Sequence, residues 1–176
     1  EIAFRHTLTQ TPQKAQLIAD KALLRGNISA KGLLRLANVK LTMGDATEAV
    51  TLAQRAIALG PVESRMHTVL GTSYLLLNQI EQAKVQLAKA ISLAPSDPNP
   101  EMEFANMYLR KEQPEEAYAI LKNLTQRFPK NIVVWMQFGE LSVVLERSDA
   151  HLAFEKVLTL DPHHWAAKRS LEEIAP

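Results

Sequence analysis

Residues 64–95 read SRMHTVLGTSYLLLNQIEQAKVQLAKAISLAP, and this stretch decides the fold because its residue types recur along the chain. The stretch ends in Pro95, one of four prolines that fall 34, 34 and 33 residues apart, at positions 61, 95, 129 and 162. Counted back from Pro95, the residues that recur are Leu70, Gly71, Tyr74, Ala83, Leu87 and Ala90. The spacing predicts one short structural unit copied several times.

The neighbouring copies keep small, large and aromatic residues at the same offsets. The copy before Pro129 has Phe104, Ala105, Tyr108, Ala117, Leu121 and Leu124, and the copy before Pro61 has Leu36, Ala37, Lys40, Ala49, Ala53 and Ala56. Only Lys40 breaks this pattern. In the last copy one residue is missing between the two halves, near Glu146 to Ser148. We therefore expect four units, the last of them slightly shortened.

Each copy is predicted to be a pair of helices joined by a tight turn. Apolar residues recur at three- and four-residue steps over 30–41 and again over 46–59, with Gly44 in the interruption. Asp45 and Glu48 have the spacing of a helix-capping pair. Each second helix ends at a proline, which lacks the N–H for the next backbone hydrogen bond. Small residues then allow the paired helices to approach closely: Ala37, Gly71, Ala105 and Gly139 on first helices, and Ala49, Ala83, Ala117 and Ala150 on second helices.

A period of 34 residues with this pattern resembles the tetratricopeptide repeat, over about residues 11–162. Because one hairpin cannot bury its apolar face alone, the resemblance implies an all-α fold, a right-handed superhelical solenoid of stacked antiparallel helix pairs. The expected segments of this single array are a partial repeat at 1–27, repeats at 30–61, 64–95, 98–129 and 132–162, and a capping helix at 163–176. We expect Trp165, Leu171 and Ile174 to cover the last hairpin.

Composition sets further limits on function. The 176 residues carry a net charge of +1, which gives no general attraction to nucleic acids or acidic membranes. The chain has no cysteine, which excludes disulfides, thiolate catalysis and thiolate-bound zinc. No signal peptide or membrane-spanning run is visible, and the missing initiator methionine indicates a piece of a longer protein.

The sequence offers little that resembles a catalytic or metal site. His163 and His164 are adjacent, but neighbouring residues at a helix start diverge by about 100 degrees and no third ligand is evident, so we expect a solvated helix cap. His67 is expected to pack in the core. The serines have no accompanying base or glycine-rich turn, and no phosphate-binding glycine loop is present. The prediction is a protein that is not an enzyme, with no cofactor and no metal.

The resemblance to tetratricopeptide repeats also implies a binding surface, because first helices line the concave groove in that family. Carried over position by position, the expected partner-binding residues are Lys31, Leu34, Arg35, Asn38, Arg65, Thr68, Thr72, Leu76, Asn99, Met102, Glu103, Asn106, Arg110, Met136, Gln137 and Glu140. They combine amides and hydroxyls with aliphatic and methionine side chains, which suits an extended peptide or a helix. The alternative is that the apolar members simply pack against the next helix.

The charges of this expected groove differ between its ends. Lys31, Arg35 and Arg65 make one end basic, whereas Glu103 and Glu140 make the other acidic. A bound segment of opposite charge order is therefore expected. Only one position matches the lysine and asparagine pattern by which chaperone-binding members of the family grip two carboxylates, so that clamp is rejected.

The leading hypothesis is a non-enzymatic scaffold that binds another protein. The ungapped repeats resemble bacterial tetratricopeptide proteins of envelope assembly, secretion, pilus or cytochrome-maturation systems, which implies a cytoplasmic or periplasmic domain, with a lean towards a membrane-tethered protein. One alternative is the targeting or substrate-presenting domain of a larger enzyme. Another is an RNA-binding helical repeat, which the near-neutral charge disfavours. Self-association is a further alternative.

Overall fold

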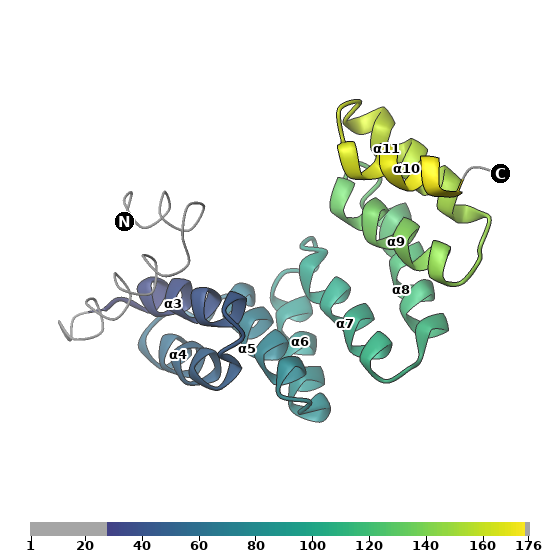
Figure 1. The fold of residues 1–176 in the computed structure, drawn as a ribbon. Helices are drawn as coiled ribbons and strands as arrows, with labels where there is room; N and C mark the ends of the chain where they lie inside the picture. Colours follow the sequence, from purple (N-terminus) through teal and green to yellow (C-terminus); the bar gives the residue numbers. More distant parts are fainter. Residues whose placement is uncertain (1–27, 175–176) are drawn as a thin grey trace. The chain divides into compact units, whose positions relative to one another are not determined.

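The computed structural model describes residues 28–174, and every regular element in that range is an α-helix (Figure 1). The expected partial repeat at 1–27 lies outside the described residues. The described chain divides into two compact units, residues 28–97 and residues 98–174. The all-α fold of stacked helix pairs is confirmed within each unit, while a single continuous array stays a prediction.

The first unit contains two helical hairpins. Helices α3 (Ala30–Thr42) and α4 (Ala46–Leu59) form the first, and α5 (Ser64–Leu76) and α6 (Ile80–Leu93) form the second. Helix α5 packs on α4 and also touches α3, so the two hairpins are stacked. Their shared core contains Leu33, Leu36, Leu52, Met66, Val69 and Leu70.

The second unit repeats this plan and adds one helix. Its elements are α7 (Asn99–Arg110), α8 (Pro114–Arg127), α9 (Ile132–Val144), α10 (Asp149–Leu160) and α11 (Trp165–Ile174). Helix α9 packs on α8, and α11 packs on α10. The prolines at positions 100 and 114 lie in the first turns of α7 and α8, where a missing N–H costs nothing.

Every first helix ends in the same backbone motif. The residue two positions past each helix end has a positive φ: 83° at Gly44, 57° at Asn78, 57° at Glu112 and 53° at Glu146. The N–H of this residue donates a hydrogen bond to the carbonyl three residues earlier, as Gly44 does to Leu41. The N–H of the next residue donates to the carbonyl five residues earlier, as Asp45 does to Lys40. This is a Schellman cap, which satisfies the orphan carbonyls and turns the chain sharply. Only Gly44 adopts the left-handed conformation without strain.

Glycine is required at the helix crossing of two hairpins, that of α5 with α6 and that of α9 with α10. A Cβ placed on Gly71 would lie 2.7 Å from Leu87 Cγ, and one on Gly139 would lie 2.7 Å from Phe154 Cε1. Both distances are far inside van der Waals contact. The prediction that these positions set the close approach is confirmed, with a refinement. The nearest atoms belong to the larger side chain on the second helix, Leu87 or Phe154, and the Ala83 carbonyl oxygen would lie 3.4 Å from a Cβ on Gly71.

Three predicted details can be compared directly with the structure. His67 is buried, as expected, and its Nδ1 lies 2.7 Å from Gln86 Oε1. Lys40, which replaces the repeated aromatic residue, is also buried and pairs with Glu48 at 2.5 Å. Asp45 caps α4 by accepting the Glu48 N–H at 3.2 Å, as predicted. The Glu48 carboxylate forms the ion pair with Lys40, so the cation at the aromatic offset is neutralised.

The missing residue of the last hairpin falls at the start of its second helix. From the positive-φ residue to the repeated buried alanine is five residues in the first hairpin, Gly44 to Ala49, but four here, Glu146 to Ala150. The Ala150 N–H bonds the Arg147 carbonyl at 3.2 Å, a tighter turn than in an α-helix. The deletion therefore lies where the sequence predicted it.

The last helix covers the end of unit 2, but with a different residue from one that the sequence suggested. Leu171 and Ile174 pack on the cluster around Phe154 and Val157, as expected, together with the fully buried Ala167. Trp165 is 73% exposed. The prediction for Trp165 was wrong because the helix starts at this residue, and its ring faces solvent while Ala167 meets α10.

Candidate functional site

Part of the expected binding surface lies on α3 and α5 of the first unit, and we call it the unit-1 face. It comprises Lys31, Leu34, Arg35, Asn38, Arg65, Thr68, Thr72 and Leu76. Lys31, Arg65 and Leu76 are exposed, so this face keeps its basic charge at the surface. Leu34 is only 4% exposed and belongs to the core between the two hairpins. It therefore packs against its neighbours and is not available as an apolar contact.

Polar groups of the unit-1 face already use their donors within their own helices. Asn38 Nδ2 donates to the Leu34 carbonyl at 3.0 Å. The hydroxyls of Thr68 and Thr72 donate to the carbonyls of Ser64 and Thr68, at 3.1 and 3.0 Å. Since a hydroxyl has one hydrogen and two lone pairs, the threonine oxygens still present acceptors.

The corresponding residues of unit 2 lie on α7 and α9, and we call them the unit-2 face. They are Asn99, Met102, Glu103, Asn106, Arg110, Met136, Gln137 and Glu140. Met102 is 6% exposed and lies in the core, so, like Leu34, it is not available as an apolar contact for a partner. Met136 is half-buried against the cluster of Phe154. The exposed members are the polar ones, Asn99, Arg110 and Glu140.

The unit-2 face opens into a hollow of about 270 Å³, lined by Asn106, Leu109, Leu121, Gln137, Glu140, Leu141 and Val144. Three residues expected from the sequence meet here: Asn106, Gln137 and Glu140. The aliphatic walls come from α7, α8 and α9. Asn106 Nδ2 lies 3.4 Å from Glu103 Oε2 on the same helix. Gln137 Oε1 is buried and accepts no hydrogen bond within residues 28–174. The hollow thus combines an apolar lining with an unpaired acceptor.

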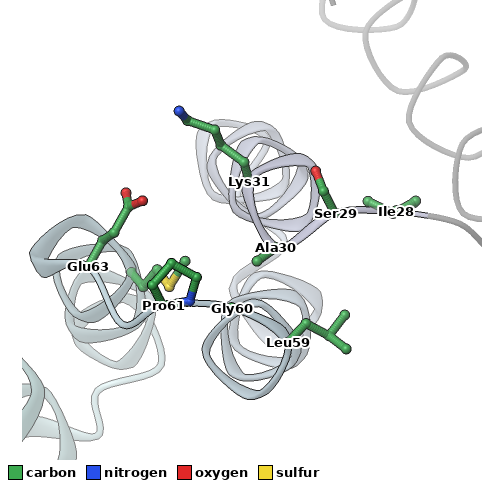
Figure 2. A pocket seen from close by; sticks show the side chains of 9 residues that line it. Ile28, Ser29, Ala30, Lys31, Leu59, Gly60, Pro61 and Glu63 are labelled. Carbon is green, nitrogen blue, oxygen red and sulfur yellow. The ribbon is translucent and has the colours of Figure 1, made fainter.

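Sequence reasoning missed a second hollow, of about 430 Å³, in unit 1. It lies where α3 and α5 begin and α4 ends (Figure 2). Figure 2 shows Lys31 and Glu63 extending from its rim and Leu59 directed away from it. Gly60 allows the end of α4 to lie close to the start of α3, because a Cβ on Gly60 would lie 2.6 Å from Ala30 Cβ. The Gly60-Pro61 pair was the only signal for it in the sequence.

The densest group of charges in unit 2 joins α8 to α10, away from the unit-2 face. The Tyr118 hydroxyl donates a hydrogen bond to Asp149, and Lys122 Nζ lies 3.4 Å from the same carboxylate. Arg147 makes a two-pronged ion pair with Glu115, at 2.8 Å to each oxygen, and its guanidinium lies 5.2 Å from the Tyr118 ring centroid. These contacts hold the shortened hairpin onto its neighbour.

The same contacts shift the pKa values of the groups involved. The hydrogen bond from Tyr118, aided by the charge of Lys122, lowers the pKa of Asp149 below its usual range. That hydrogen bond and burial raise the pKa of the Tyr118 hydroxyl. Every polar group in this cluster has a partner, so it fits a structural role.

The histidines near the C-terminus act at the helix start. The Ala167 N–H donates to His164 Nδ1 at 3.2 Å, and the His163 N–H donates to an Asp161 carboxylate oxygen at 3.0 Å. This is the helix cap that the sequence predicts. Across residues 28–174, no three His, Asp or Glu side chains are grouped as metal ligands would be. In the same range, no helix has the length and apolar character needed to cross a membrane.

The geometry defines a structural class, stacked helical hairpins that present polar first-helix faces. Residues 64–97 match the family model described as "Tetratricopeptide repeat". The matched residues are helices α5 and α6, and the other described hairpins share the same helix-pair fold. No curated protein sequence matches the chain at a significant level.

Solved structures with this fold resemble the chain along most of its length. The thermophilic tetratricopeptide protein TTC0263 of Thermus thermophilus aligns with a TM-score of 0.79 at 19% identity, covering 96% of this chain and 92% of that one. YrrB, described as having an unusual peptide-binding site, aligns with a TM-score of 0.60 at 21% identity, covering 94% and 86%. The structure of pilF of Pseudomonas aeruginosa aligns with a TM-score of 0.68 at 18% identity, covering 82% of this chain and 66% of that one. At these low sequence identities, the similarity shows that the chain shares the fold of these proteins.

Proposed function

We propose that this protein is a non-enzymatic scaffold that binds a segment of another protein on its first-helix faces. The tetratricopeptide fold is typical of protein-interaction scaffolds, and YrrB, which shares the fold, is described as having a peptide-binding site. The observation that carries the proposal is the hollow of the unit-2 face, where amide and carboxylate groups border an aliphatic lining. Such a surface suits a peptide, whose backbone needs hydrogen bonds and whose side chains need apolar contacts.

The unit-1 face supports the same role with different chemistry. Lys31 and Arg65 are exposed there, beside threonine oxygens that can accept hydrogen bonds from a backbone. A segment that contacts this face would gain from acidic side chains, which would set its orientation and association rate more than its affinity. The setting is proposed to be a bacterial envelope-assembly, secretion, pilus or cytochrome-maturation system, on the likeness of the ungapped repeats alone.

The proposal is tested by changing both faces together. In the variant Asn38→Ala, Arg65→Glu, Asn106→Ala, we expect loss of the partners that the parent captures from a native lysate, measured by crosslinking and quantitative mass spectrometry. The matched control carries Lys84→Glu and Asn123→Ala, both at exposed positions on second helices, and should keep those partners. Circular dichroism verifies that all three proteins are folded. An unchanged set of partners in the face variant would show that binding occurs elsewhere.

A further inference from the structure

The hollow of the unit-2 face is divided along its length into a polar part and an apolar part. On α9, Gln137, Glu140 and Val144 follow at three- and four-residue steps, so they share one side of the helix. The 34-residue period makes Glu103 equivalent to Gln137 and Asn106 equivalent to Glu140. The amides and carboxylates therefore lie towards the middle of α7 and α9. The aliphatic groups lie towards the helix ends, where Val144 is 74% and Leu109 38% exposed.

The polar part of the hollow has acceptors that lack donors. Gln137 Oε1 is buried without a hydrogen bond, an arrangement that is unfavourable for a polar atom removed from water. The Glu140 carboxylate is exposed and has no ion pair or hydrogen bond within residues 28–174. Both groups would be satisfied by a cationic donor, because an ammonium or guanidinium offers several N–H groups at once. The residues that line the hollow include no lysine or arginine.

The size of the hollow limits what can enter. At about 270 Å³ it is smaller than the roughly 300–1,000 Å³ of sites that enclose a small-molecule ligand. It has room for one aliphatic side chain and the stem of its neighbour. The four-residue step from Glu140 to Val144 rises about 6 Å along α9, and a two-residue step of an extended chain spans about 6.6 Å. An extended segment can thus place side chains at alternate positions against both parts.

We infer that the unit-2 hollow binds an extended segment of another protein in which an aliphatic side chain is followed or preceded, two residues away, by arginine or lysine. The aliphatic side chain lies against Leu109, Leu121 and Val144. The cation meets Glu140 and gives Gln137 Oε1 its donor, after a rotation of the Gln137 side chain. This inference rests on the proposed function and specifies the chemistry of the partner at one of its two faces.

The test uses three synthetic peptides that read the same in both directions, so the direction of binding does not matter. They are acetyl-Arg-Ser-Leu-Ser-Arg-amide, its charge-reversed form with glutamates at the ends, and a form with serine in place of leucine. Binding is followed by ¹H–¹⁵N NMR titration of the full chain at low salt. We expect the first peptide to shift the amide signals of Asn106, Gln137, Glu140 and Val144. We expect the other two peptides to bind about tenfold more weakly, which corresponds to about 1.4 kcal/mol.

Two variants sharpen this test. Glu140→Arg should reverse the preference between the arginine and glutamate peptides, because attraction becomes repulsion. Gln137→Leu should weaken the arginine peptide and leave the glutamate peptide unchanged. Lys84→Glu, at an exposed position of α6 outside both faces, is the control and should alter neither titration. Equal affinity for the first two peptides, or shifts that fall outside the hollow, would overturn the inference. If that happens while the lysate experiment still shows face-dependent capture, the proposed function stands and only the partner's chemistry is wrong.

Discussion

The two units place the same repeat offsets in different surroundings, and their faces differ as a result. In unit 1, α3 and α5 touch, and Val69 is 4% exposed in the core between the hairpins. In unit 2 the equivalent position on α9 holds Gln137, whose Oε1 is buried without a partner within residues 28–174. There, α7 and α9 make no comparable contact and border a hollow. The closed stack thus has a valine at the face position where the stack with a hollow has a glutamine.

The largest effect is expected at the helix crossings that both units share. Gly71→Arg in unit 1 and Gly139→Arg in unit 2 should each lower the free energy of unfolding by roughly 3 kcal/mol or more, because even a Cβ overlaps the opposing side chain. Urea unfolding followed by circular dichroism measures this. Ala88→Arg at an exposed position of α6 is the control. A melting curve like the parent's for either glycine variant would contradict the crossing geometry.

A smaller effect should follow from making the unit-2 face resemble the unit-1 face. Gln137→Leu removes the buried unpaired oxygen and adds apolar contact, so the unfolding free energy of unit 2 should rise by about 1 kcal/mol. Amide hydrogen exchange of α7–α9 reports the change. Gln126→Leu at an exposed position of α8 should have no such effect. Destabilisation by Gln137→Leu would mean that the side chain has a partner in solution.

Substitutions at the positive-φ residues of the turns should change the free energy of unfolding by a similar amount. Glu112→Gly and Glu146→Gly should each stabilise unit 2 by about 1 kcal/mol, since glycine relieves the left-handed strain, which outweighs its larger unfolded-state entropy. Gly44→Ala should destabilise unit 1 by about the same amount. Thermal unfolding compares the three variants. Identical melting temperatures would show that the strain is absorbed elsewhere in the cap.

The smallest effect is expected from acid acting on Asp149 of unit 2. Because the hydrogen bond from Tyr118 lowers the pKa of Asp149 in the folded state, this stabilisation is present above the unfolded pKa and is lost as pH falls through the folded pKa. Asp149→Asn should cost up to about 1 kcal/mol near pH 7 and flatten the acid side of the stability profile. Tyr118→Phe should do the same. A profile unchanged by both variants would show that the contact contributes no net stability.

Much of the fold could be predicted from the sequence because the same residue types recur at the same offsets in four copies. The helix pairs, the proline stops, the Asp45 cap and the position of the deletion all follow from short-range patterns. The caps at Asn78, Glu112 and Glu146 could not be predicted, because none has the glycine that normally marks a left-handed residue. The alignment of the copies shows that all four occupy one position, which was the available signal.

The candidate site was predicted less completely, because exposure depends on the neighbouring helix. Sequence offsets place Leu34, Met102 and Gln137 alike on first-helix faces, yet the first two are in the core. Their burial is set by the hairpin that follows each one, and a single copy does not contain that information. The hollow could not be predicted either, because its lining includes Leu121 of the second helix α8 as well as residues of the first helices α7 and α9.

The exposed Trp165 has a practical consequence. Both tryptophans of the chain lie in unit 2, with Trp135 partly buried beside Phe138 and Trp165 open to water. Intrinsic fluorescence excited at the indole band therefore senses only the C-terminal half, whereas far-ultraviolet ellipticity averages over all helices. If the halves lose structure at different denaturant concentrations, the two optical signals will give separate midpoints from one unlabelled sample.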